Sequence, residues 1–103
     1  MQLVELQEHY DEFQNAGVEV VALVVAPMSS VDGVRQSIGI SYPVLADTDH
    51  RVSEEYGVYN LLGDGVAAPA VFIIGSDGQI VWHYVGANAN DRLSAETILA
   101  HLP

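Results

Sequence analysis

VEVVALVVA, at residues 18–26, is the stretch that decides the fold of this chain. Its residues are largely β-branched and almost without exception apolar, a pattern typical of a strand buried on both faces of a sheet. Such strands belong to parallel or mixed sheets that are covered by helices. The amphipathic segment 2–16 comes before it and ends at Gly17, a common left-handed stop. We therefore expect a helix over 2–16 followed by a buried strand.

The rest of the chain continues the alternation of helix and strand patterns. The expected elements are a helix capped by Ser29, with Asp32 completing a capping box, and ended by Gly39; a short strand at 44–46; a short helix at 50–56 ended by Gly57; a loop at 59–68; a second buried strand at 70–75; a hairpin turn at 76–78; an antiparallel strand at 79–86; and a last helix at 93–102 capped by Asn90 or Asp91. This order indicates one layered α/β domain over residues 1–103.

Charge limits the partners that the chain can have. Fourteen acidic residues face three arginines and no lysine, for a formal net charge of −11 at pH 7. The resulting field repels nucleic acid and anionic lipid, so we expect neither as a partner. It also destabilises the compact state unless salt screens it. We favour a surface suited to high salt, as in halophilic proteins, over an ordinary acidic surface that is merely solvated.

Two further patterns concern the cellular compartment. No apolar run approaches the roughly 20 residues that a membrane span requires. The first ten residues, MQLVELQEHY, lack the basic and apolar regions of a secretory signal. We therefore expect a cytoplasmic protein with no membrane partner.

The sequence contains no cysteine. It therefore offers no disulfide, no thiolate ligand and no nucleophilic thiol. No two histidines have the i, i+4 spacing of a helical metal site, and we interpret each as a surface or packing residue. The histidines are His9, His50, His83 and His101. No metal site is expected.

Other motifs of binding and catalysis are also incomplete. Asp47, Asp49 and His50 resemble the start of a calcium loop, but Val52 stands where its glycine is required, so a solvated helix cap is the better interpretation. LLGDGVAAP, at 61–69, has no GK[ST], and no G-x-G-x-x-G follows a strand. No serine lies in a G-x-S-x-G elbow. We expect no cofactor.

Pro69 is the one unusual residue, because it directly precedes a strand that is predicted to be central. A proline there removes a ladder donor. It can simply begin the strand, or the Ala68–Pro69 bond can be cis and shape a functional wall. Position alone does not separate the two.

Three segments together resemble the redoxin group of the thioredoxin superfamily. These are VEVVALVVAP after an amphipathic helix, YPVLADTDHRVSEEYGV at 42–58, and GVAAPAVFIIGSDGQIVWHYVG at 65–86. The group comprises the alkyl hydroperoxide reductase/thiol-specific antioxidant (AhpC/TSA) proteins, which include peroxiredoxins. The resemblance implies a thioredoxin-like three-layer α/β/α sandwich with a mixed sheet. It also implies thiol-dependent reduction of peroxides or disulfides.

The chain departs from this family at its beginning. The resemblance implies an earlier strand and a reactive cysteine in a T-x-x-C or C-x-x-C context, just upstream of Met1. On this basis we expect a partial domain that is inactive alone and lacks the central strand between 18–25 and 70–75. We expect first that the native protein is longer. In the second possibility another chain, such as a second copy in a homodimer, donates a strand at the exposed sheet edge. In the third, the strands at 18–25 and 70–75 close on each other. A thioredoxin-like reductant is a partner only if a longer chain carries the cysteine.

The same resemblance bears on Pro69. Peroxiredoxins usually have an arginine near this point, whereas thioredoxin-like redoxins have a cis-proline, so the resemblance favours a cis bond and closer kinship with the latter. Ala67, Ala68 and Pro69 then mark the remnant of the active-site groove, with no catalytic residue. The alternative function is a non-enzymatic protein-interaction domain that keeps the thioredoxin fold.

Overall fold

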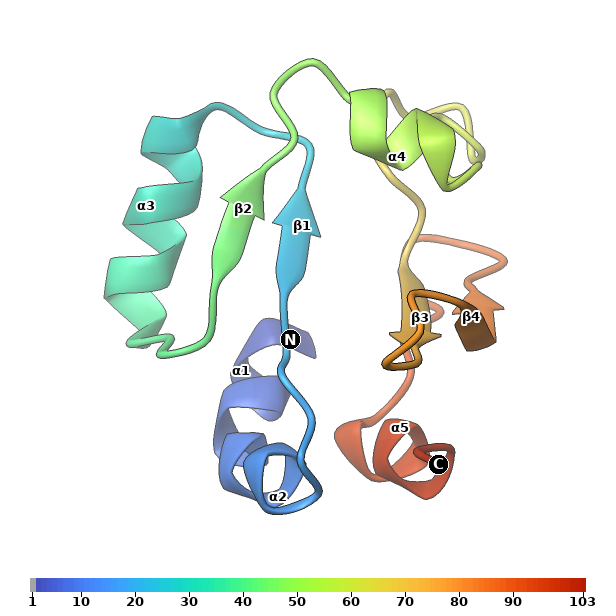
Figure 1. The fold of residues 1–103 in the computed structure, drawn as a ribbon. Coiled ribbons are helices and arrows are strands. Elements are labelled where there is room, and N and C mark those ends of the chain that lie inside the picture. Colours follow the sequence, from blue (N-terminus) through green and yellow to red (C-terminus); the bar gives the residue numbers. More distant parts are fainter. Residues whose placement is uncertain (1) are drawn as a thin grey trace.

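Helices and strands alternate along the chain in a computed structural model that describes residues 2–103 (Figure 1). In chain order the elements are α1 (Gln2–Glu8), α2 (Tyr10–Asn15), β1 (Ala22–Val24), α3 (Met28–Ile38), β2 (Val44–Ala46), α4 (Arg51–Glu55), β3 (Ala70–Ile74), β4 (Ile80–Val85) and α5 (Ala95–Ala100). The predicted short strand at 44–46 and the hairpin of 70–86 are confirmed. No helix within the described residues combines the length and the apolar character needed to cross a membrane.

The strands form two separate pairs rather than one sheet. β1 and β2 run parallel, with Ala22 opposite Val44, and β3 and β4 run antiparallel, with Ala70 opposite Val85. Within residues 2–103, β1 and β3 do not pair with each other. Figure 1 shows them as the two inner strands, with β2 and β4 outside. The expected arrangement without a central strand is confirmed, and the alternative in which these two strands close on each other does not form.

The predicted helix over 2–16 is broken at His9. This residue has φ −104° and ψ 9°, so α1 ends before it and α2 begins after it. The break lets residues of the two helices pack in different hydrophobic clusters. Tyr10 packs in a cluster with Tyr42, whereas Phe13 packs in a second cluster with Ile98. Gly17 ends α2 with φ +75°, as predicted.

The prediction that residues 18–26 are buried on both faces is wrong. Val20, Ala22 and Val24 pack against the cluster around Tyr42, which also includes Tyr10 and Val31. On the opposite face Val21 is 55% exposed and Leu23 38% exposed. The strand β3 is also only half-buried, since Ile73 alone among its residues is buried. Apolar composition predicted the strands, but it did not show that the face of Val21 and Leu23 has no helix packed on it.

The predicted helix caps differ from those observed. Pro27, not Ser29, precedes α3, and no side chain caps that helix. The cap of α5 is Ser94, whose hydroxyl accepts a hydrogen bond from the Thr97 N–H, and not Asn90 or Asp91. Several residues near each helix start can act as caps, and the packed position of the first turn selects among them.

The segment predicted as a plain loop at 59–68 is folded on itself. Tyr59 and Ala67 form an isolated antiparallel bridge. The Asn60 N–H donates to the Val66 carbonyl at 2.8 Å, and the Asn60 Oδ1 accepts from the Gly65 N–H at 2.8 Å. This hairpin leads the chain into β3 through Ala67, Ala68 and Pro69.

Candidate functional site

Ala67, Ala68 and Pro69 form a short extended segment that is held from both sides. The Ala68 N–H donates to the Val58 carbonyl at 3.0 Å, next to the bridge of Ala67. The Pro69 carbonyl accepts from the Gly86 N–H at 2.7 Å. Ala68 and Pro69 are buried and Ala67 is half-buried. The segment thus joins the hairpin of 59–67 to the β3–β4 pair.

The prediction of a cis Ala68–Pro69 bond is wrong. The described residues contain no cis peptide bond, so this one is trans. The trans bond keeps the chain extended from the Ala67 bridge into β3, with hydrogen bonds before and after it. Pro69 therefore lies at the entrance to β3, directly before Ala70, which agrees with the simpler of the two interpretations.

Gly86 is a structural partner of this segment that sequence reasoning missed. A Cβ atom on Gly86 would lie 2.5 Å from the Asp91 carbonyl oxygen and 3.2 Å from the Pro69 carbonyl oxygen. Only glycine lets the end of β4 approach Pro69 this closely. The sequence signal that could have identified Gly86 is its position directly after the predicted strand, because the hairpin pairing places that position opposite Pro69.

Asp91 holds the turn that follows Gly86. Its carboxylate accepts from the Ala87 N–H at 2.8 Å and from the Tyr84 hydroxyl at 2.7 Å. These two hydrogen bonds, that of Ala87 first, lower the pKa of Asp91 below its ordinary value, although partial burial opposes them. The same bond raises the pKa of Tyr84. These hydrogen bonds fix the turn of residues 84–91, which contains the Gly86 N–H that bonds to Pro69.

Asp47 is a buried helix cap rather than the solvated one expected. It is 4% exposed and accepts from the Ser53 N–H at 2.8 Å, the Ser53 Oγ at 2.7 Å and the Val52 N–H at 3.2 Å. Burial raises the pKa of this carboxyl, but the hydrogen bonds from Ser53 and Val52 outweigh it and leave the pKa lowered. The carboxylate fixes the start of α4.

His50 connects α4 to the hairpin beside the candidate segment. Its ring stacks on Tyr59 with the ring centroids 3.9 Å apart. Its Nδ1 lies 3.0 Å from the Glu54 Oε1, in an orientation that does not form a hydrogen bond. A further aromatic row runs from Tyr56 to Phe72 and His83, with centroid separations of 4.8 and 5.8 Å. These contacts are structural.

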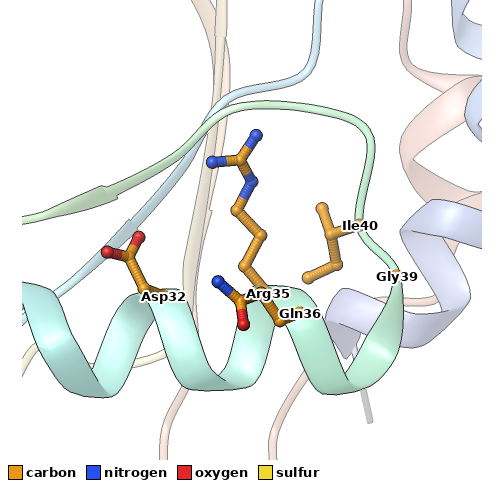
Figure 2. Close-up of a pocket in the computed structure, with 5 residues that line it drawn as sticks. All are labelled: Asp32, Arg35, Gln36, Gly39 and Ile40. Carbon is orange, nitrogen blue, oxygen red and sulfur yellow. The ribbon is translucent and has the colours of Figure 1, made fainter.

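A shallow hollow lies beside α3 and the turn after it, far from Pro69 in the sequence. Figure 2 shows its lining: Asp32, Arg35, Gln36, Gly39 and Ile40. The Arg35 side chain extends from the helix without meeting Asp32. Among residues 2–103 the close contacts between basic and acidic side chains are His9–Glu12 and His50–Glu54, so Arg35 has no carboxylate partner. Nothing in the hollow activates a nucleophile.

The described part of the chain also brings no three His, Asp or Glu side chains together as metal ligands. With no cysteine in the sequence, the segment around Pro69 has no ionisable sulfur beside it. The segment therefore cannot supply the attacking group of a thiol reaction.

Comparison with known sequences gives a consistent match. A family model described as the AhpC/TSA family matches residues 1–83. The putative peroxiredoxin YkuU of Bacillus subtilis is 31% identical in an alignment of 104 positions, and the match covers 94% of this chain and 57% of that protein. The thiol-disulfide oxidoreductase ResA of the same organism is 32% identical over 77 residues, covering 74% of this chain and 39% of that protein. Relatives of both kinds thus match, and the chain spans less than two thirds of each.

Solved structures match as well. Enterococcus faecalis AhpC superposes with a TM-score of 0.83 and 27% identity, over 94% of this chain and 60% of that one. Mycobacterium tuberculosis AhpC gives a TM-score of 0.83 at 20% identity, over 95% of this chain and 56% of that one, which shows the fold alone. These likenesses confirm the predicted fold class.

Proposed function

Because the chain belongs to the AhpC/TSA family, we propose that it forms the scaffold of a domain for thiol-dependent reduction of peroxides or disulfides. We propose further that these 103 residues do not carry out the reaction alone. The observation that carries the second part is the absence of cysteine from a chain with this family's fold.

The reaction makes the requirement for sulfur explicit. A thiolate attacks one peroxide oxygen, the O–O bond breaks, and the leaving oxygen takes a proton to become water or an alcohol. The sulfur is oxidised to a sulfenic acid, which condenses with a second thiol to a disulfide and releases water. Two electrons from another thiol pair then restore the first thiol. A methionine thioether cannot ionise and takes no part in such a cycle.

The role that we propose for Ala67, Ala68 and Pro69 is that of a groove wall. Their support is the two-sided hold described above: the bond from Ala68 to Val58 and the bond from Gly86 to Pro69. A wall held this way positions a neighbouring reactive group without taking part in bond changes. A thioredoxin-like reductant becomes a partner only in a form that contains the sulfur.

Peroxide consumption by the purified chain, with dithiothreitol as reductant, tests whether it is inactive alone. We expect no turnover. The two methionines can consume at most two equivalents by oxidation to sulfoxides, and Met28, 57% exposed, reacts readily. The variant Met28→Leu serves as the control and should lower this stoichiometric consumption. Sustained consumption beyond two equivalents, after subtraction of the direct reaction of dithiothreitol with peroxide in a protein-free sample, would contradict the proposal.

A gain-of-function experiment tests the scaffold. A β-strand followed by a Thr-x-x-Cys segment, as the family resemblance implies, is fused ahead of residue 1. We expect peroxide turnover with a thiol reductant, and none from the same fusion with serine in place of the cysteine. A fusion that is folded by circular dichroism, with its thiol reactive toward a maleimide, but without turnover would show that these residues do not provide the scaffold.

A second candidate function, a non-enzymatic interaction domain, is favoured by a different observation. Leu23 on β1 and Leu45 on β2 lie opposite each other and are 38% and 48% exposed, and Val21, directly before β1, is 55% exposed. Neighbouring apolar side chains left in water are typical of surfaces that bind another protein. Homodimerisation through the sheet edge is one form of this role, and sedimentation velocity of the isolated chain tests it.

A further inference from the structure

The break between α1 and α2 lies beside the start of α5, which comes from the other end of the sequence (Figure 1). The Glu5 Oε1, on α1, accepts from the N–H of Ala95, the first residue of α5, at 2.7 Å. Phe13, on α2, packs in one hydrophobic cluster with Ala95 and Ile98. The position of α5 therefore depends on a hydrogen bond from one helix and on an apolar contact with the next.

His9, the residue at the break, brings an imidazole into this junction. Its Nδ1 lies 2.8 Å from the Glu12 Oε1 on α2. The carboxylates of Glu5 on α1 and Glu96 on α5 also lie close enough to act on the charge of the ring. Each of the three helices thus supplies one carboxylate. Since no arginine in residues 2–103 forms an ion pair with these carboxylates, the imidazole is the group that can offset their charge.

The two charge states of His9 act differently on the junction. The protonated ring donates from Nδ1 to Glu12 and places a positive charge among the three carboxylates. The neutral ring can keep the same hydrogen bond through its Nδ1–H tautomer, but it brings no charge. The carboxylates of Glu5, Glu12 and Glu96 then repel one another across the contact between α5 and the other two helices.

We propose that His9 is a proton-dependent latch that holds α5 against the break between α1 and α2. The latch is closed when the imidazole is charged and loosened when it is neutral. Loosening weakens the hydrogen bond between Glu5 and Ala95 and lets solvent reach the Phe13 cluster. This regulatory device goes beyond the proposed scaffold role and does not depend on sulfur chemistry.

The pH range of the latch follows from the environment of the ring. The hydrogen bond with Glu12 raises the pKa of His9 above 6.5, partial burial opposes this rise, and the charges of Glu12, Glu96 and Glu5 add to it. A raised pKa in the folded chain means that the stabilisation is fully present below about pH 6.5, the unfolded value. It is lost as the pH rises through the folded pKa.

Hydrogen exchange of the Ala95 amide, measured by NMR on the full chain, tests the latch. Protection factors are compared at about pH 5.5 and about pH 8.5, on either side of the ordinary imidazole pKa, after correction for the intrinsic exchange rate. We expect the protection of Ala95 to fall roughly twofold to fivefold at the higher pH, the range typical of partly exposed charge pairs. The change should follow the titration of the His9 ring signals.

A pair of variants separates His9 from the other histidines. His9→Gln keeps a donor for Glu12 but cannot become charged, so the protection of Ala95 should no longer depend on pH and should stay at the high-pH level of the wild type. His83→Gln is the matched control. The His83 ring stacks on Phe72 and takes part in neither of the contacts between a histidine and a carboxylate. This variant should keep the wild-type pH dependence.

A double-mutant cycle tests whether the charge of His9 acts on α5 itself. His9→Gln and Glu96→Gln are measured singly and together by urea denaturation. We expect a favourable coupling between the two residues at about pH 5.5 that disappears at about pH 8.5 and in potassium chloride at about 1 M. A purely structural role of His9 would give the same coupling under all three conditions.

Three outcomes would overturn the proposal: protection of Ala95 that does not change with pH, a change that persists in His9→Gln, and a coupling that is equal at both pH values. If His9→Gln does not fold, the wild-type chain decides, because the midpoint of the His9 ring titration must then coincide with that of the Ala95 protection. Peroxide turnover is measured separately, so failure of either proposal leaves the other unaffected.

Discussion

Gly86 and Gly33 differ in the room that each leaves for a side chain. At Gly86 a Cβ would lie 2.5 Å from the Asp91 carbonyl oxygen, whereas at Gly33, inside α3, nothing lies within 4 Å. The first glycine is required by the close approach of β4 to Pro69. The second only weakens its helix, because glycine loses more backbone freedom than alanine on folding. Two residues of one type thus have opposite effects.

We predict that Gly86→Ala lowers the free energy of unfolding by about 1–3 kcal/mol, because the carbonyl of Asp91 must move away. Gly33→Ala is the matched control and should raise it by about 0.5–1 kcal/mol. Urea denaturation followed by circular dichroism measures both. Equal effects of the two substitutions would show that the contact between Gly86 and Asp91 is not tight.

At the scale of elements, α4 depends on one buried carboxylate. The helix is short, from Arg51 to Glu55, and Asp47 binds the N–H groups of Val52 and Ser53 together with the Ser53 hydroxyl. The sequence predicted this helix and its approximate bounds. It did not predict that the cap is buried, because burial depends on the packing of β2 and of the hairpin at 59–67.

We predict that this cap makes stability depend on pH in the acid range. The pKa of Asp47 is lower in the folded chain than its ordinary value, so ionised Asp47 stabilises the fold above about pH 4. This stability is lost as the pH falls through the lower, folded pKa. Asp47→Asn should flatten the dependence of melting temperature on pH below about pH 4, and Ser53→Ala should do so in part. Slopes that match the wild type would contradict the proposed role of Asp47.

At the scale of the whole molecule, negative charge is the dominant property. Among the described residues the close contacts between basic and acidic side chains are His9–Glu12 and His50–Glu54, so no arginine pairs with a carboxylate. Repulsion among the exposed carboxylates is therefore little offset at neutral pH. Salt shortens the range of this repulsion from about 30 Å at 0.01 M to about 3 Å at 1 M.

We predict that the melting temperature rises steeply between dilute buffer and molar potassium chloride. Each kcal/mol of screened repulsion corresponds to a rise of roughly 4–8 °C for a domain of this size. A variant with Glu8→Gln, Asp11→Asn and Glu55→Gln removes three exposed charges that form no ion pair. It should be more stable in dilute buffer and respond less to salt. A flat response of the wild-type chain would exclude adaptation to salt.

Local patterns in the sequence determined the order of the helices and strands, and composition excluded thiol redox chemistry by the isolated chain. Apolar runs, glycine stops at Gly17 and Gly39, and the hairpin turn at 76–78 act through near neighbours, so they can be recognised without the fold. The absence of cysteine is a property of composition alone. It excludes thiol redox chemistry by the isolated chain whatever its tertiary structure.

Only the tertiary structure decided which of these local possibilities were used. The break at His9 separates the packing of Tyr10 from that of Phe13. The parallel pair of β1 and β2 depends on pairing between residues far apart in the chain. Exposure and strand pairing are set by distant neighbours, and a sequence pattern contains only the near ones.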